Sequence, residues 1–445
     1  MPDFPRVLFL TPCAFNPITG GGVTFTNLFQ GWPRDRLATV TDDPVPVSRD
    51  TCDRYFFLSD QELQYVPPLN WLRRRTAPQQ EPRPNEMPQP VWGPRGWVKR
   101  LAKRVVGNAG LPESGQLSPS LRSWLADFQP DLVYTILGTP GYLDLLEAIC
   151  RPSNIPFVMH IMDNGTIDPL RTGLFSGYLR RSYARRMDAL VPRAAQCLAI
   201  GDAMAEEYGM RFGRSFIPFQ NTIDLARRQH PQMGDLTCSQ PARVMYIGSI
   251  LPYAVLNSLR DCCRAIEALN RTGLPVQLEI YTALELFGQQ AQMLAVDPMI
   301  QLRPVPRSDE GFFDLLAQAD VLLLPVNFDP ASVHYIRLSM PTKVPAYLAS
   351  GVPTLVYGPP SVAQVEYARR HQWGHVVDQP SAELLENGLR DILTDSALRR
   401  RLSQRAQETA TRFHDARKVR TTFQEALMAA GRRRHHPLPA RRRSA

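Results

Sequence analysis

A short polar stretch near residue 340 carries the side chains best suited to bind an anion. It reads Ser339-Met-Pro-Thr342-Lys343 and joins an apolar run at 321–324 to a helical run at 342–350. A helix start presents backbone N–H groups that have no partner within the helix, and such groups bind phosphates. Two hydroxyls and an ammonium beside them would add hydrogen bonds and charge. The stretch therefore predicts a diphosphate site formed by Ser339, Thr342 and Lys343.

Lys343 is the main cation expected at this site. A helix dipole disfavours a cation at the N-terminus by about a few tenths of a kcal/mol, and a bound diphosphate would remove that conflict. An exposed first-turn lysine is the plainer alternative. Tyr347, one turn further on, is expected either near the nucleoside of a bound nucleotide or in the core.

A glycine turn follows another apolar run, at 244–247. Gly248 lets a ligand approach the backbone closely, and the Ser249 hydroxyl can donate a hydrogen bond to a phosphate or a sugar. The loop that follows, residues 250–257, holds no cation. We therefore expect Gly248 and Ser249 to bind the same anion as Lys343, which supplies the charge.

Three consecutive glycines near the N-terminus form a weaker candidate site. They lie in a loop between an apolar strand at 6–11 and a helix at 24–32. This order places backbone N–H groups against an anion. Gly21 and Gly22 are therefore predicted to contact a phosphate, and a plain flexible turn is the alternative.

A histidine and an aspartate stand at the end of the strand predicted at 156–160. His160 and Asp163 are expected to point out of the carboxyl edge of a parallel sheet, where ligands of such sheets bind. Both are the candidate catalytic residues. The alternative for His160 is a buried, hydrogen-bonded position in the core.

The elements that must position these residues alternate between apolar strands and helices. This pattern indicates an α/β protein in which helices cover both faces of parallel sheets. A chain of 445 residues suits two domains. We expect an N-terminal Rossmann-like domain at 1–224 with a proline-rich, basic insertion at 60–120, a linker at 225–241, a C-terminal Rossmann-like domain at 242–405, a helix at 406–430 and a disordered basic tail at 431–445.

The stretch at 319–360 also resembles a known family. Its "D-V-L-L-L-P … S-x-P-T-K-x-x-x-Y-L-A-S-G-x-P" pattern is similar to the donor half of retaining GT-B glycosyltransferases of the family 4-like group, which includes bacterial polysaccharide enzymes. The resemblance extends to residues 243–249, to 367–368 and to the N-terminal glycines. These enzymes usually carry a Glu in the short helix and another eight residues earlier. Ala346 and Leu338 occupy those positions here.

The resemblance implies a fold and a reaction. Two doubly wound parallel-sheet domains would face a cleft, and the C-terminal helices would cross back to the first domain. The enzyme would transfer a sugar from a nucleotide-diphosphate sugar, its co-substrate, to a glycan or lipid-linked acceptor. The resemblance also implies that the sugar keeps its anomeric configuration and that the enzyme needs neither a cofactor nor a metal ion. The sequence contains no convincing D-x-D metal-binding motif that would argue for a metal.

Charge and composition limit other functions. The net charge of +9 divides into +6 in the tail at 432–443, +7 at 71–105 and −4 elsewhere, which argues against nucleic acid as a partner. A basic amphipathic segment that begins at Trp97, together with the tail, predicts peripheral contact with an anionic membrane.

Seven cysteines without C-x-x-C spacing are expected to be reduced. No apolar run reaches the length of a membrane span and no signal peptide is recognisable, so we expect a cytoplasmic protein.

Two other functions stay open at this point. A catalytically inactive GT-B scaffold that binds a partner glycosyltransferase would explain Ala346 and Leu338. A sugar-nucleotide epimerase on the same fold would need acid and base residues at the active site and no second substrate.

Overall fold

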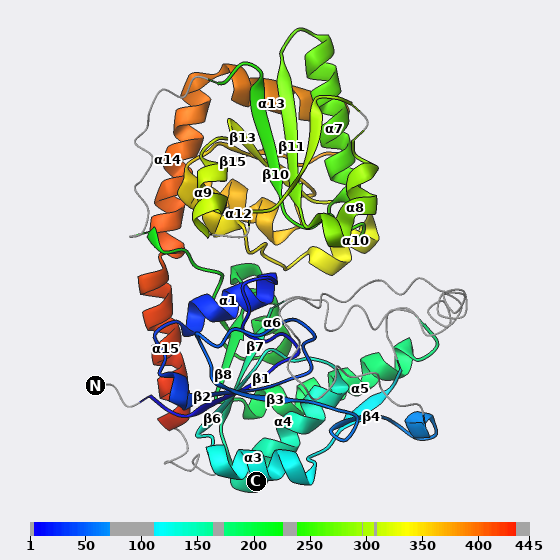
Figure 1. Cartoon of the computed structure of the whole chain (residues 1–445), viewed down its shortest axis with the longest axis vertical. Helices are drawn as coiled ribbons and strands as arrows, with labels where there is room; N and C mark the ends of the chain where they lie inside the picture. The colour runs from blue at the N-terminus through cyan, green and yellow to red at the C-terminus, as the bar shows by residue number, and fades with distance from the viewer. Residues whose placement is uncertain are drawn as a thin grey trace, which may run out of the picture. The chain divides into compact units, whose positions relative to one another are not determined.

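The chain forms two compact units in the computed structural model, which describes residues 4–71, 111–162, 173–225, 238–295, 297–306 and 309–432. One unit is Met1–Asn221 with Lys418–Ala445, and the other is Thr222–Arg417 (Figure 1). The sequence prediction placed these changes of domain after residues 224 and 405, whereas the two units divide after Asn221 and Arg417. Asp163, the segment beginning at Trp97 and the tail from 433 onward lie outside the described residues.

The first unit is built on a seven-stranded parallel sheet in the order β3-β2-β1-β6-β7-β8-β9. The chain moves outward from β1 in one direction and then returns to add strands on its other side, which is the doubly wound arrangement. The strands are β1 (Val7–Leu10), β2 (Leu37–Thr41), β3 (Arg54–Phe57), β6 (Leu132–Thr135), β7 (Phe157–Ile161), β8 (Gln196–Ala199) and β9 (Ile217–Pro218).

The connections of this unit are mostly helical. They comprise α1 (Gly20–Phe29), α3 (Pro119–Phe128), α4 (Pro140–Ser153), α5 (Ser176–Leu190) and α6 (Asp202–Phe212). Between β3 and α3 the described residues include a small antiparallel pair of β4 (Leu63–Tyr65) and β5 (Glu113–Gly115). Most of the insertion predicted at 60–120 lies outside the described residues.

An aromatic cluster fills one face of the first sheet. Phe9 on β1 contacts Phe25 and Phe29 of α1, and its ring centroid lies 5.1 Å from that of Tyr134 on β6. The last helix, α15 (Ala416–Arg432), adds Phe423, whose ring meets Phe29 edge-on at 5.1 Å. The buried rings bring the end of the chain into the core formed by its beginning, so α15 belongs to the first unit from Lys418 onward.

The second unit repeats the doubly wound pattern with six parallel strands in the order β12-β11-β10-β13-β14-β15. The strands are β10 (Ala242–Ile247), β11 (Val276–Thr282), β12 (Ile300–Pro304), β13 (Val321–Pro325), β14 (Thr354–Tyr357) and β15 (Gly374–Val377). The chain reverses direction between β10 and β13, which pair side by side. In such sheets ligands bind beyond the carboxyl ends of the strands at this switch point.

Helices of the second unit follow its strands in order. They are α7 (Leu256–Arg271), α8 (Leu284–Gln292), α9 (Asp309–Leu316), α10 (Pro330–Ile336), α11 (Val344–Ser350), α12 (Ala363–His371), α13 (Ala382–Thr394) and α14 (Ser396–Phe413). Buried side chains line both faces of the sheet, because two separate apolar clusters flank it. No helix in the described parts of the chain has the length and hydrophobicity needed to cross a membrane.

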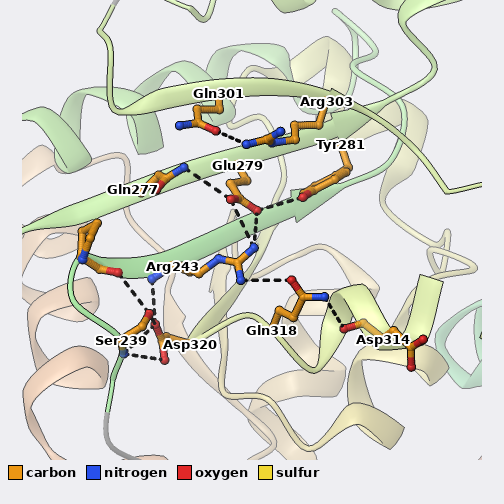
Figure 2. A network of polar contacts seen from close by, with 11 residues as sticks. Ser239, Arg243, Gln277, Glu279, Tyr281, Gln301, Arg303, Asp314, Gln318 and Asp320 are labelled. Atoms are coloured by element: carbon orange, nitrogen blue, oxygen red, sulfur yellow. Dashed lines mark hydrogen bonds and ion pairs between the residues drawn. The ribbon is translucent and has the colours of Figure 1, made fainter. Parts of the chain in front are cut away.

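Buried carboxylates stabilise the second sheet near the amino ends of its central strands. Figure 2 shows Glu279 on β11 accepting hydrogen bonds from Arg243 and Tyr281, and Asp320 accepting from the backbone N–H of Arg243 at 2.7 Å. Asp320 also accepts from Ser239. Asp320 immediately precedes β13, and Arg243 is near the start of β10, so these contacts fix the amino ends of the two central strands.

One expected boundary was wrong because of a local cap. The glycines at 20–22 begin helix α1, because the Thr19 side chain caps it by accepting from the N–H of Gly22. Helix α10 follows β13 in a segment for which no helix was expected, and Asp329 caps it.

Candidate functional site

The switch point of the second unit carries the predicted anion-binding residues. Gly248 immediately follows β10, Asn327 lies two residues after β13, and Lys343 immediately precedes α11 as its N-cap. The helix was expected to begin at Thr342. Because it begins at Val344, the Lys343 side chain is free to leave the helix and turn toward β10.

The Lys343 ammonium is packed against the end of β10. Its Nζ donates a hydrogen bond to the carbonyl oxygen of Ile247 at 2.8 Å and lies 4.0 Å from the ring centroid of Tyr246. A Cβ added to Gly248 would come within 2.8 Å of the same nitrogen. Gly248 also has a φ of 144°, a conformation that side chains disfavour. The structure therefore brings Gly248 and Lys343 together, as predicted.

Lys343 has unusual electrostatics for a lysine. Burial lowers the pKa of its ammonium from 10.5 to about 7, and no neighbouring charge opposes that shift. Across the described ranges no carboxylate forms an ion pair with it; a carbonyl oxygen and two tyrosine rings surround it instead. The residue as a whole keeps part of its surface exposed. A buried cation without an anionic partner is costly, and an incoming anion would offset that cost.

The rings of Tyr347 and Tyr246 pack against the Lys343 ammonium. The Tyr347 side chain is fully buried, and its hydroxyl accepts a hydrogen bond from the N–H of Ile247 at 3.2 Å. Of its two expected locations, near a nucleoside or in the core, the structure shows core packing. Tyr246 donates to the carbonyl oxygen of Ser249 at 2.6 Å, so both hydroxyls fix the turn around Gly248.

Asn327 links the two loops of the switch point. It is fully buried, and its Oδ1 accepts from the N–H groups of Asn257 and Ser258 at 3.1 and 3.2 Å. Its Nδ2 donates to the carbonyl oxygen of Pro252 at 2.9 Å and to Ser332 at 3.2 Å. The loop after β10, the start of α7 and the start of α10 are thereby held by one side chain.

The remaining predicted residues of this site lie in the two connecting segments. Ser249 is exposed beside Gly248. Ser339 and Thr342 are partly exposed in the segment between α10 and α11, and the N–H of Ser339 bonds to the carbonyl oxygen of Ile336 at 2.9 Å. No ligand contact is defined for these three residues, so their roles stay predictions.

The two positions that carry Glu in the resembling enzymes are apolar and closed to solvent. Leu338 is 4% exposed and Ala346 is 8% exposed. Ala346 packs in the apolar cluster on one face of the sheet. Their side chains therefore offer no polar contact to a sugar, and another group must provide it if a donor binds here.

Gly21 and Gly22 lie in the first turn of α1. A Cβ at Gly22 would come within 2.4 Å of the Asn16 side chain, so the helix start is packed closely against the preceding loop. Asn16 is fully buried and accepts from the N–H groups of Ile18 and Thr19 at 3.0 and 2.7 Å. The glycines thus allow close packing within the first unit, and their predicted contact with a phosphate stays untested.

His160 is fully buried on β7. Its Nδ1 lies 2.6 Å from the hydroxyl oxygen of Tyr134, and burial lowers the pKa of the imidazole to about 3. The ring is therefore neutral near pH 7 and has no surface for a substrate to contact. This position matches the core alternative for His160, and its predicted partner Asp163 lies outside the described residues.

Sequence reasoning missed Asn327 and Tyr246. The signal for a capped helix after Asn327 was present, because Asp329-Pro330 is a common pair at the N-cap and first position of a helix. No local pattern shows that the Tyr246 ring packs against the Lys343 ammonium, because the two residues are 97 positions apart in the sequence. Among the described residues no group of three or more His, Cys, Asp or Glu side chains is arranged to hold a metal ion.

Comparisons with solved structures show the fold. The chain is similar to HepE of Anabaena in complex with UDP-glucose, with a TM-score of 0.58 and 12% identity over 95% of this chain and 99% of that one. It is also similar to sucrose-phosphate synthase from Thermosynechococcus elongatus, with a TM-score of 0.59 and 12% identity over 94% and 98%. WaaG, a glycosyltransferase of lipopolysaccharide biosynthesis, gives a TM-score of 0.55 and 15% identity over 94% and 99%.

These similarities define the class of architecture. The chain has the GT-B fold, with two Rossmann-like α/β domains, which confirms the fold expected from the sequence. No protein-family model matches the sequence, and a search of the curated proteins found no match. At 15% identity or less, the likeness concerns the fold alone.

Proposed function

We propose that the protein is a glycosyltransferase that moves a sugar from a nucleotide-diphosphate sugar to a hydroxyl of a glycan or lipid-linked acceptor. Cell-surface polysaccharide synthesis is the process that suits such an acceptor. The observation that carries the proposal is the buried Lys343 ammonium, which faces Gly248 at the switch point of the second sheet and has no carboxylate partner among the described residues. Solved structures of the same fold include complexes with UDP-glucose and UDP-2-fluoro glucose, which supports a sugar nucleotide as donor.

In this proposal Lys343 acts on the leaving group. When the bond between the sugar and the diphosphate breaks, negative charge grows on the diphosphate oxygens. A fixed ammonium in a site with little water stabilises that charge strongly and needs no reorganisation. Gly248 leaves room for the Lys343 ammonium beside the backbone, and Ser249 donates a hydrogen bond to the diphosphate. We also propose retention of configuration and no metal requirement; loss of activity in EDTA that Mn²⁺ restores would contradict the second point.

Acceptor binding is assigned to the first unit. Asp163 is our candidate for contact with the acceptor or the transferred sugar. Because the imidazole of His160 is buried and neutral, we assign it a positioning role at the end of β7, next to the chain that leads to Asp163.

A thermal-shift panel tests the donor site directly. UDP, GDP, ADP and CMP would be added with their common sugar conjugates to the wild type and to Lys343→Met, which keeps the length of the side chain without its charge. A ligand at 100 times its dissociation constant adds about 2.7 kcal/mol of stability. We expect one diphosphate to shift the wild type and to lose at least tenfold in affinity in Lys343→Met.

A non-catalytic scaffold is the second candidate, and one observation favours it. The two Glu positions of the resembling enzymes are buried and apolar at Leu338 and Ala346. A scaffold predicts that no nucleotide or sugar nucleotide shifts the wild type in the same panel. An epimerase would convert the donor to its isomer without any acceptor, which product analysis would reveal.

We further propose that an anionic membrane surface is a partner of the first unit. Helix α5 exposes Arg180, Arg181 and Arg185, and exposed Leu174 and Tyr178 adjoin them at its start. Basic residues near an anionic leaflet contribute about 1 kcal/mol each. Co-sedimentation with vesicles containing anionic lipid should therefore fall when the three arginines are changed to serine, and unchanged sedimentation would contradict this contact.

A further inference from the structure

The loop after β10 holds an exposed aromatic side chain that the proposed donor site has not used. Tyr253 is 49% exposed, and its ring meets that of Tyr335 on α10 edge-on, with centroids 5.0 Å apart at an interplanar angle of 82°. Both rings belong to segments that follow the carboxyl ends of the neighbouring strands β10 and β13. They therefore lie at the same edge of the sheet as Gly248.

The loop that carries Tyr253 is fixed on both sides of the ring. The Nδ2 of Asn327 donates to the carbonyl oxygen of Pro252 at 2.9 Å. Its backbone N–H donates to the carbonyl oxygen of Ala254 at 2.8 Å. The Leu251 carbonyl oxygen accepts from the N–H groups of Ala254 and Val255. An exposed ring on so constrained a backbone loses little freedom when a ligand stacks on it, because its position is set beforehand.

We infer that Tyr253 is the stacking surface for the transferred sugar ring of the donor, an inference that rests on the proposed function. The flat C–H face of a pyranose carries slight positive charge, and the face of an aromatic ring carries negative charge. The loop at 248–257 contains no charged side chain, so it suits a neutral ring better than a phosphate.

One further observation favours the sugar over the base as the stacked ring. The backbone carbonyl oxygens of Leu251, Pro252 and Ala254 already accept hydrogen bonds, so little remains beside Tyr253 to read the edge of a base.

Paired affinities separate this inference from the proposed function. Dissociation constants would be measured for UDP and UDP-glucose, and for the GDP and ADP pairs, with wild type, Tyr253→Ala, Tyr253→Phe and Met293→Ala. Tyr253→Phe keeps the ring. Met293 is 53% exposed at the far end of α8 and serves as a matched control for loss of an exposed apolar side chain.

The expected result is selective. Tyr253→Ala should bind the sugar nucleotide about three- to tenfold more weakly, in line with the typical strength of an aromatic contact, and should bind the free diphosphate as the wild type does. Tyr253→Phe and Met293→Ala should behave as wild type. Equal weakening for both ligands would assign the ring to the base or the diphosphate and overturn the inference, as would no weakening at all. A wild type that binds no member of any pair would instead refute the proposed function on which it rests.

Discussion

The ammonium nitrogen of Lys343 lies where a side chain at Gly248 would have to go, 2.8 Å from the position that a Cβ would take. The two residues are 95 positions apart in the chain, yet each is explained by the other. Glycine leaves the space, and lysine fills it with a charge. The proposed anion site rests on this close pairing of a glycine with a lysine.

Gly248→Ala should disrupt nucleotide binding more than it disrupts the fold. The new methyl group would displace Nζ from the Ile247 carbonyl oxygen, and the backbone strain at φ 144° should cost about 1–3 kcal/mol. Gly273→Ala is the matched control, because Gly273 also has a positive φ, of 84°, and a Cβ there would meet nothing within 4 Å. Chemical denaturation should show both variants destabilised, and titration with the nucleoside diphosphate should show weaker binding only for Gly248→Ala. Equal affinity in the two variants would contradict the proposed contact.

The architecture could be predicted from the sequence because its signals are local. The apolar runs at 244–247 and 321–324 became most of β10 and of β13, since continuous hydrophobicity bounded by turns already indicates a strand buried on both faces. The helix starts were less accurate. Thr19 moved the start of α1 through a single side-chain cap, which shifts a boundary by a few residues without changing the apolar pattern. Helix α10, which Asp329 caps, was not expected from the sequence.

The site was predicted only in part because its decisive contacts are tertiary. Lys343 was recognised as a cation near a helix start, but its burial depends on Tyr246 and Ile247, which only the fold brings near. The link that Asn327 makes between two loops is likewise invisible in either loop alone. His160 at a strand end looked functional by position, and its burial against Tyr134 follows from how β6 and β7 pair.

Lys343 should make the stability of the second unit depend on pH. Because burial lowers the pKa of Lys343 from 10.5 to about 7, the unfolded chain binds a proton between these pH values that the folded protein does not. The free energy of unfolding should therefore rise with pH through this window, by at most about 1.4 kcal/mol per pH unit from this group. Denaturation of wild type and Lys343→Met from pH 7 to 9 would measure the difference. Parallel pH profiles for the two proteins would show that the lysine is not buried as described.

Binding of a diphosphate should draw a proton onto Lys343. At pH 8 the free amine is mostly neutral, since its pKa is about 7, and an adjacent anion favours the charged form. Calorimetric titration at pH 8 in two buffers with different ionisation enthalpies should therefore show net proton uptake in the wild type. Lys343→Met should show no such uptake. Binding without proton uptake in the wild type would place the diphosphate away from this lysine.

Asn327→Ala should destabilise the second unit strongly. It would leave the Pro252 carbonyl oxygen and the N–H groups of Asn257 and Ser258 without their partner, at a cost of about 3 kcal/mol. Ser332→Ala removes the contact to Nδ2 at 3.2 Å and the hydrogen bond between the Ser332 hydroxyl and Asp329, and should cost about 1 kcal/mol. Urea denaturation would compare the two variants. Similar small losses would mean that Asn327 does not hold the loops together.

His160 should make the first unit sensitive to acid without titrating near neutral pH. Burial lowers the pKa of its imidazole from 6.5 to about 3, so below pH 6.5 the unfolded chain gains a proton that the folded protein excludes. The free energy of unfolding should fall as the pH drops from about 6.5 toward 3, by at most about 1.4 kcal/mol per pH unit from this residue. His160→Gln keeps a polar group facing Tyr134 and should reduce that loss, which denaturation at pH 7 and pH 5 would measure. In the folded wild type, the histidine ring resonances should not titrate between pH 5 and 8; a midpoint near 6.5 would show instead that the imidazole is accessible and would restore it as a candidate catalytic base.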